Sequence, residues 1–184
     1  MQLDPQIFLR LAEKAGTLAC FDLECTGLRS DYNSVLVGSI KPYGQKVTTF
    51  TVKQPGNDQK VVREIKEYLE TFDVICGYYS KGFDAPFLNT RLLKWNQPPV
   101  KKLLHIDMYY MLKYNLLTAR RSQGHLLSFL ETPENKMSVG ANYWNEVLYN
   151  PKAMEKMVDR CESDVIGLEQ LYTRTRHLIA DIKR

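Results

Sequence analysis

The chain has 184 residues, of which 44 % are hydrophobic and 25 % are charged, and its formal net charge is +4. Domains usually hold about 100–200 residues, so we predict a single domain over residues 1–184, and this composition argues against a disordered chain. No apolar run approaches the ~20 residues that cross a bilayer, and residues 1–10 lack the apolar segment of a signal peptide, so a membrane or exported protein is not expected.

The predicted elements begin with an N-terminal helix within residues 1–16, which Asp4 caps and Gly16 ends. Residues 17–107 are predicted to form a sheet core, and residues 108–184 a mostly helical part. The expected strands are 17–25, 35–40, 47–52, 73–78 and 103–107. The expected helices after the first are 58–72, 84–95, 108–117, 124–131, 141–148 and 151–179.

The order of these elements indicates the fold class. A hairpin of strands comes first, and strands alternating with helices follow it. This order predicts an α/β protein with a mixed five-stranded sheet flanked by helices. In the first helix, the apolar side is predicted to comprise Ile7, Phe8, Leu11, Ala12 and Ala15.

The cysteines favour a reducing compartment. No two of the four form a CxxC pair, which argues against a zinc ribbon. Cys20, Cys76 and Cys161 each lie in an apolar stretch, so we interpret them as reduced core residues. A cytoplasmic protein is therefore expected.

The segment FDLECTGL holds the first candidate site residues. Asp22 and Glu24 lie two apart on a predicted strand, so both side chains leave the same face. Two adjacent carboxylates repel each other unless a cation lies between them, and hard divalent cations prefer oxygen ligands. The alternative is an exposed face of an edge strand, but the apolar residues 17–21 favour a central strand.

Two further carboxylates lie in less distinctive surroundings. Asp84, in the segment FDAPFL, follows a predicted strand and begins a helix, where it could be a cap, a ligand or both. Asp164 falls within an apolar stripe of the last predicted helix, and a carboxylate on a packed face needs a partner. Metal coordination and a pair with Arg160 both remain open.

The segments DLECTGL, FDAPFL and the later SDV together resemble the three motifs of the DEDD superfamily of 3′–5′ exonucleases. The resemblance is strongest to predicted exonucleases related to the proofreading domains of family B polymerases. It implies a ribonuclease H-like fold with two Mg²⁺ or Mn²⁺ ions. The catalytic, metal-binding carboxylates would be Asp22, Glu24, Asp84 and Asp164. The first, second and fourth would hold one ion, and Asp22 and Asp84 the other.

The same resemblance implies contacts with the substrate. Thr26, Gly27 and Leu28 match the stretch that meets the terminal nucleotide. Lys81 could hold a backbone phosphate. Tyr79, or its neighbour Tyr78, could stack on a base, although a tyrosine buried in the sheet fits the sequence equally well.

Three positions depart from the family pattern. A Tyr four residues before the last Asp, or a His five before, usually serves as the general base, but here those positions hold Arg160 and Asp159. Arginine cannot act as a base at neutral pH. Tyr79 stands where many relatives have Asn. Asp107 resembles a further Asp of these domains, and we interpret it as a helix cap or structural group.

The missing base leaves three outcomes open. Another group such as Tyr149 or His125 orients the water, the metal alone supplies hydroxide, or the domain binds without cleaving. All four carboxylates are present, which favours retained activity.

Charge is distributed unevenly along the chain. Residues 91–121 hold seven basic residues and one acidic residue, which gives +6 and leaves −2 for the remainder. Such a segment suits a surface that grips phosphates, although a solvated face is an equal alternative. We therefore predict a metal-dependent 3′–5′ exonuclease acting on single-stranded DNA or RNA. The alternatives are a structure-specific endonuclease on the same fold and a non-catalytic nucleic-acid-binding module.

Overall fold

A five-stranded sheet with the order β3-β2-β1-β4-β5 forms the centre of the computed structural model, which describes residues 4–134 and 146–180. The strands are β1 Leu18–Cys25, β2 Val35–Pro42, β3 Thr48–Thr51, β4 Val74–Gly77 and β5 Leu104–Asp107. The pairs β1–β2 and β2–β3 are antiparallel, whereas β1–β4 and β4–β5 are parallel. The predicted mixed five-stranded sheet is confirmed.

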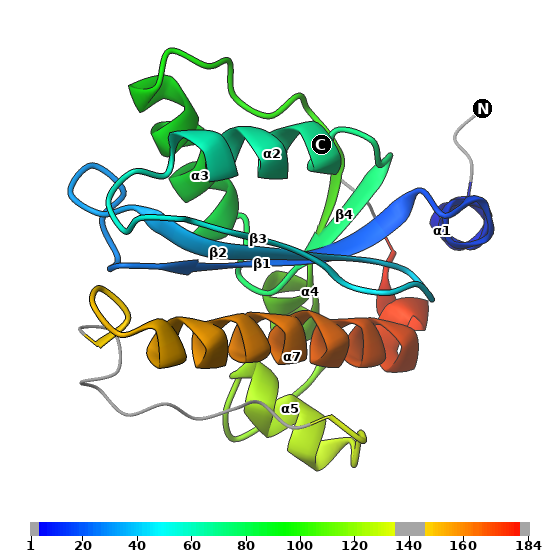
Figure 1. Cartoon of the computed structure of the whole chain (residues 1–184). Helices are drawn as coiled ribbons and strands as arrows, with labels where there is room; N and C mark the ends of the chain where they lie inside the picture. Colours follow the sequence, from blue (N-terminus) through cyan, green and yellow to red (C-terminus); the bar gives the residue numbers. More distant parts are fainter. Residues whose placement is uncertain (1–3, 135–145, 181–184) are drawn as a thin grey trace.

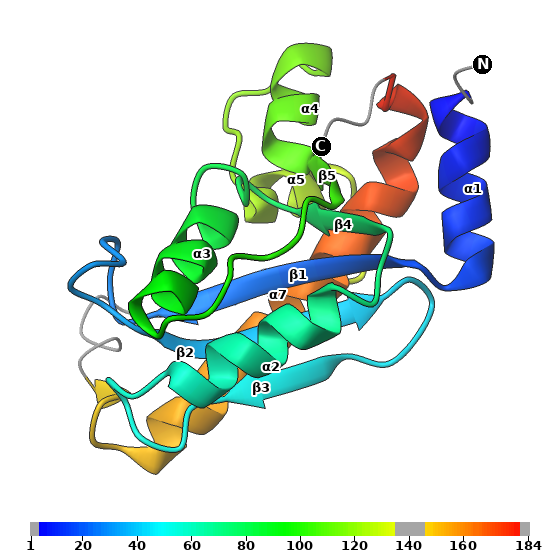
Figure 2. The same ribbon diagram turned by 90° about the horizontal axis from the view of Figure 1, so that it is seen from above.

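Helices cover both faces of this sheet (Figure 1). Their bounds are α1 Pro5–Ala15, α2 Gln59–Leu69, α3 Asp84–Lys94, α4 Met108–Asn115, α5 Gln123–Phe129 and α7 Pro151–Thr175, with a 3₁₀ turn at Arg176–Leu178. The helices α2 and α3 lie on one face, and α7 runs along the other, where α5 packs against it (Figures 1 and 2). The long α7 therefore spans the side of the sheet onto which alternate β1 residues project.

The strand β1 lies in the middle of the sheet, between β2 and β4. Every one of its residues is buried except Asp22, which is partly exposed. This burial excludes the alternative that Asp22 and Glu24 decorate an exposed edge strand. The two carboxylates instead enter the interior, where each needs a compensating charge or hydrogen bonds.

The helix α1 is capped as the sequence predicts, but a different part of it is buried. The Asp4 carboxylate accepts a hydrogen bond from the Gln6 amide (2.8 Å), and Gly16 ends the helix at φ +71°. Leu9 and Ala12 are buried, whereas Ile7 and Leu11 are 51 % and 56 % exposed. The predicted apolar side was therefore wrong at Ile7, Leu11 and Ala15, which are exposed, and it did not include the buried Leu9. The helix lies beside the sheet and not on one of its faces (Figure 2). Only a narrow stripe of α1 is therefore buried.

Several element boundaries differ from those the sequence predicts. The strand β2 continues to Pro42, because its pairing with β1 extends to Ala19, and β3 is shorter than predicted. Long-range pairing, which local propensity does not encode, sets these ends. The predicted helix 141–148 lies mostly outside the described residues.

The four cysteines are unbridged and buried, and for Cys20, Cys76 and Cys161 this agrees with the predicted core positions. No helix in the described part of the chain combines the length and the apolar character needed to cross a bilayer.

Candidate metal centre

Three of the predicted carboxylates meet between the sheet and α7. Asp22 and Glu24 come from β1, whose pairing with β2 shifts register between Glu24 and Cys25, and Asp164 comes from α7. One ligand oxygen of each lies within 4.8 Å of the other two. Register irregularities in a strand re-aim side chains and are frequent beside active sites. The structure therefore brings together residues that are up to 142 positions apart in the sequence.

The donor set suits a hard divalent cation. Glu24 and Asp164 are buried, and Asp22 is partly exposed. Three carboxylates in so small a space repel one another, and in a low dielectric this repulsion is strong. Oxygen ligands of this kind are those that Mg²⁺ and Mn²⁺ prefer. The chemistry of these residues therefore fits a divalent metal ion.

Asp84 lies next to this group and is fixed to β1. It is the first residue of α3, after Phe83 at the cap position, so it is not the N-cap that its sequence position also allowed. Its Oδ1 accepts a hydrogen bond from the Leu23 amide (3.0 Å), midway between Asp22 and Glu24 in the chain. Burial raises the pKa of Asp84 to about 7, and the charges of Glu24 and Asp107 add to this effect, although backbone hydrogen bonds oppose it.

Arg160 lies one turn before Asp164 in α7 and contacts two of the three clustered carboxylates. Its Nε donates to Glu24 Oε1 at 2.6 Å, and its Nη2 lies 4.0 Å from Asp164 Oδ2. Burial lowers the pKa of Arg160, but the charge and hydrogen bond of Glu24, with the charges of Asp164 and Asp22, outweigh it and raise this pKa. The sequence left a pair with Asp164 open, yet the shorter contact is with Glu24.

Cys161 is a second neighbour that sequence reasoning missed. Its thiol lies 3.5 Å from the Asp22 carbonyl oxygen and 3.7 Å from Asp22 Oδ2. Burial, together with the charges of Asp22 and Glu24, raises the pKa of this thiol well above its ordinary value. Cys161 therefore stays protonated and contributes no further negative charge. No local sequence pattern signals this contact, which joins residues 139 positions apart.

The stretch predicted to meet the substrate lines a cavity beside Glu24. This cavity has a volume of about 450 Å³, and its lining comprises Leu23, Glu24, Cys25, Thr26, Gly27, Leu28 and Phe83. The Leu28 side chain is 82 % exposed at its margin. A Cβ on Gly27 would lie 2.6 Å from Asn33 Oδ1, so a side chain there would displace the Asn33 side chain. Sequence reasoning missed three of these lining residues, Leu23, Cys25 and Phe83.

The loop that carries Tyr79 and Lys81 is held by Asp107. The Asp107 carboxylate accepts hydrogen bonds from the backbone amides of Tyr79 (3.0 Å), Lys81 (2.8 Å) and Tyr109 (3.1 Å). It thereby caps α4, which confirms the structural interpretation of this residue. Tyr79 adopts φ +60°, a backbone conformation that is strained for an aromatic residue.

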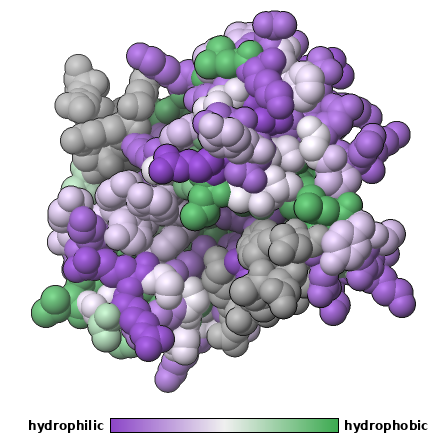
Figure 3. Space-filling view, turned by 90° about the vertical axis from the view of Figure 1, so that its left-hand side faces the viewer, coloured by the Kyte–Doolittle hydropathy of each residue, from purple (hydrophilic) through white to green (hydrophobic). Residues whose placement is uncertain are grey.

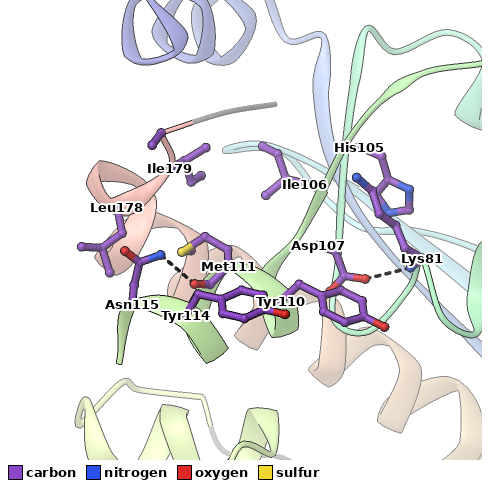
Figure 4. A pocket seen from close by; sticks show the side chains of 11 residues that line it. Lys81, His105, Ile106, Asp107, Tyr110, Met111, Tyr114, Asn115, Leu178 and Ile179 are labelled. Carbon is purple, nitrogen blue, oxygen red and sulfur yellow. Dashed lines mark hydrogen bonds between the residues drawn. The ribbon is translucent and has the colours of Figure 1, made fainter. Parts of the chain in front are cut away.

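Tyr79 and its neighbours form an aromatic cluster. The Tyr79 ring centroid lies 5.1 Å from that of Tyr109 and 5.8 Å from that of Tyr110, and 45 % of Tyr79 is exposed. A cavity of about 400 Å³ adjoins this cluster. Figure 4 shows Lys81 and Asp107 at one end of this cavity, Tyr110 along it, and Leu178 and Ile179 at the other end.

The remaining polar candidates have other surroundings. His105 is buried, its Nε2 lies 2.8 Å from Ser80 Oγ, and burial lowers its pKa to about 4, so it is a neutral core residue. Tyr149 is exposed in the turn before α7, and His125 lies in α5. Figure 3 shows the side of the molecule on which the β1–β2 loop lies, where hydrophilic residues dominate and hydrophobic patches are small and separate.

Comparisons with known proteins match this architecture. A family model described as the RNase H superfamily matches residues 19–176. A search of curated proteins gives no significant match. The fold is similar to part of the family B DNA polymerase of the hyperthermophilic archaeon Pyrobaculum calidifontis, with a TM-score of 0.71 and 17 % identity. The match covers 86 % of this chain and 24 % of the polymerase chain, so this chain spans about a quarter of that protein.

Proposed function

The chain belongs to the RNase H superfamily, and from this premise we propose that it is a metal-dependent 3′–5′ exonuclease that hydrolyses phosphodiester bonds of single-stranded DNA or RNA. Membership in this superfamily supports a nuclease in general. The observation that carries the proposal is the cluster formed by the carboxylates of Asp22, Glu24 and Asp164. Asp84 lies beside this cluster and accepts a hydrogen bond from the amide of Leu23, the residue between Asp22 and Glu24. The direction of the reaction rests on the resemblance of the three motifs to those of 3′–5′ exonucleases.

The proposal assigns two divalent cations, Mg²⁺ or Mn²⁺, to these carboxylates. Asp22, Glu24 and Asp164 would hold one, and Asp22 and Asp84 the other. When bound, such ions activate water and neutralise the phosphate and the leaving oxygen. The protein contributes the fixed positions of the oxygens, since β1 and α7 are packed against each other and the Leu23 amide orients Asp84.

The cavity beside Glu24 is the proposed place of the terminal nucleotide. Thr26 is held in place there, because its hydroxyl accepts from the Ser34 amide (3.0 Å) and donates to Asn33 Oδ1 (3.2 Å). Gly27 is partly exposed and lines this cavity, and the exposed Leu28 side chain can pack on a base. These features support substrate contacts at Thr26, Gly27 and Leu28.

The loop before Asp84 is the proposed place of the adjoining nucleotides. Tyr79 offers an exposed ring for stacking, and exposed Lys81 offers a cation for a phosphate. Because β1, β4 and β5 are parallel, their carboxyl ends lie along the same edge of the sheet. A single-stranded nucleic acid whose 3′ end reaches Glu24 can therefore extend along that edge of the sheet toward Tyr79.

Arg160 takes no part as a general base in this proposal. It occupies the position of the usual Tyr, it is paired with Glu24, and a guanidinium keeps its protons at neutral pH. The proposal therefore assigns no side chain next to Asp164 to remove the proton of the attacking water.

Linear and circular single strands of the same sequence test the direction and the need for an end. We expect Mn²⁺ to permit stepwise loss of nucleotides from the 3′ end of a linear strand that is labelled at its 5′ end. The circle should stay intact, because an exonuclease requires a terminus. Cleavage of the circle would instead support the endonuclease alternative. Binding of both strands without cleavage would support the non-catalytic module.

A further inference from the structure

Arg160 and a divalent cation would compete for the same carboxylate. The guanidinium Nε donates to Glu24 Oε1 at 2.6 Å, and Glu24 is also one of the three oxygen donors of the proposed metal centre. The other end of the guanidinium lies 4.0 Å from Asp164 Oδ2, which belongs to the same centre. Two of the three donors are therefore already next to a positive charge that belongs to the protein.

We propose that Arg160 offsets part of the negative charge of the three carboxylates in the ion-free protein, and that a divalent cation must displace it from Glu24 in order to bind. Arg160 is thus a positioning residue that sets the affinity for the ion. The inference rests on the proposed metal centre, and it goes beyond that centre by assigning a function to the residue that replaces the usual base.

In the ion-free protein, the charge of Arg160 stabilises the three carboxylates. Without a cation, Asp22, Glu24 and Asp164 place three like charges within 4.8 Å of one another, two of them on buried residues. A buried charge that is left uncompensated is strongly destabilising, whereas a paired one is tolerated. Arg160 supplies part of this compensation from within α7, and it thereby stabilises the ion-free site.

In the ion-bound protein, the charge of Arg160 opposes the cation. A divalent cation held by the same oxygens would lie close to the guanidinium, and like charges at such short range repel each other. Part of the binding free energy is then used to separate Arg160 from Glu24. Removal of the Arg160 charge should therefore destabilise the ion-free state more than the ion-bound state, and so tighten ion binding.

The test measures Mn²⁺ binding by calorimetry, and the melting temperature in chelator and in Mn²⁺, without any nucleic acid. We expect Arg160→Gln to melt at a lower temperature than wild type in chelator. It should bind Mn²⁺ about tenfold more tightly, because one nearby like charge has been removed. Its rise in melting temperature upon addition of Mn²⁺ should exceed that of wild type. Arg160→Lys, which keeps the charge, should resemble wild type in its affinity.

A matched control separates this effect from the loss of any ion pair. Lys41 forms a partly buried ion pair with Glu169 of α7 at 2.7 Å. This pair includes none of the three proposed ion-binding carboxylates. We expect Lys41→Gln to lower the melting temperature in chelator and in Mn²⁺ alike. It should leave the Mn²⁺ affinity unchanged.

Two outcomes would overturn the inference, and they can be told apart. If wild type binds Mn²⁺ and Arg160→Gln binds it equally or more weakly, Arg160 does not compete, and the metal centre stands. If neither protein binds Mn²⁺, the metal centre itself is refuted.

Should Arg160→Gln fail to fold, the nuclear magnetic resonance signal of the Arg160 Nε–H in wild type tests the inference instead. Displacement predicts that Mg²⁺ shifts this signal, and an unchanged signal contradicts it.

Discussion

Tyr79 combines an exposed aromatic ring with a backbone conformation that its residue type rarely adopts. Such strain is maintained only where the surroundings fix it, and here the Asp107 carboxylate holds the amide while the ring covers Gly82. Strained residues are concentrated at functional sites. This strain supports the proposed role of the Tyr79 ring as a platform on which a base of the substrate stacks.

Replacement of Tyr79 tests this platform. Tyr79→Asn tolerates the positive φ but removes the ring, so we expect it to weaken binding of a single strand by about 1–3 kcal/mol, the usual range for stacking of one base. Tyr79→Phe should bind like wild type. Fluorescence anisotropy in chelator, where a metal-dependent nuclease cannot cleave, measures this binding. Equal affinity of Tyr79→Asn and wild type would refute the platform.

His105 makes stability depend on pH. Because burial holds its folded pKa at about 4, below the ordinary value of 6.5, the unfolded chain binds a proton that the folded chain does not. The stability contributed by the neutral imidazole is complete above pH 6.5 and is lost as the pH falls toward 4.

We expect wild type to lose about 2 kcal/mol more than His105→Gln between pH 7 and pH 5, on the basis of this pKa difference. Urea unfolding at the two pH values measures the difference. Comparison of the two proteins cancels the carboxylates that titrate over the same range. Identical pH dependence in both would show that His105 is not kept neutral by the fold.

Sequence spacing reveals residues on one strand but not their partners across the fold. Asp22 and Glu24 could be placed on a common face because side chains alternate along a strand. The contact of Glu24 with Arg160 joins residues 136 positions apart, and no local pattern encodes such a contact. The Cys161 contact with Asp22 was hidden for the same reason.

At the scale of elements, Asp58 joins three segments of the fold. It is fully buried, and its carboxylate accepts from Arg91 Nε (2.8 Å) and Nη2 (2.9 Å) of α3, from Trp95 Nε1 (2.7 Å) and from the Val35 amide of β2 (2.9 Å). Because it directly precedes α2, it fixes α2 and α3 against the sheet. The site depends on this arrangement, since Asp84 begins α3.

Asp58→Ala should cost about 3–5 kcal/mol of unfolding free energy, because it leaves the buried Arg91 charge without its partner. Glu64→Ala is the control on the surface of α2, where it breaks an exposed pair with Lys60. This control should cost less than about 1 kcal/mol. Chemical denaturation measures both. Equal losses would show that Asp58 does not hold these elements together.

The types of these elements were predictable, whereas their ends and buried faces were less so. Apolar runs and caps located β1, α2 and α3 to within a few residues. The exposure of Ile7 and Leu11 depends on how α1 lies against the sheet, and amphipathicity alone does not specify which half of a broad apolar side is covered. Similarly, the end of β2 at Pro42 follows from pairing with β1.

The strand order and the packing of α7 on the sheet bring the site residues together. The order of strands places β1 at the centre of the sheet. The helix α7, which comes late in the sequence, packs against β1 and β2. Asp164 thereby reaches Asp22 and Glu24, a proximity that the sequence indicated only through the resemblance of its motifs. The sequence also located the basic segment 91–121, which includes the end of α3 and all of α4.

The metal-dependent nuclease proposed here is tested most directly by a comparison of wild type with Asp164→Asn on single-stranded DNA and RNA labelled at the 5′ end. Asp159→Asn is the control, because it makes the same change at an exposed position of α7. We expect wild type and the control to shorten at least one of the two strands from its 3′ end in Mn²⁺. Chelator should stop this reaction. Asp164→Asn should slow it at least about 100-fold, as expected when a ligand of catalytic metal ions is lost. Cleavage that persists in chelator or in Asp164→Asn, or substrates that stay intact throughout, would contradict a metal-dependent nuclease at this site.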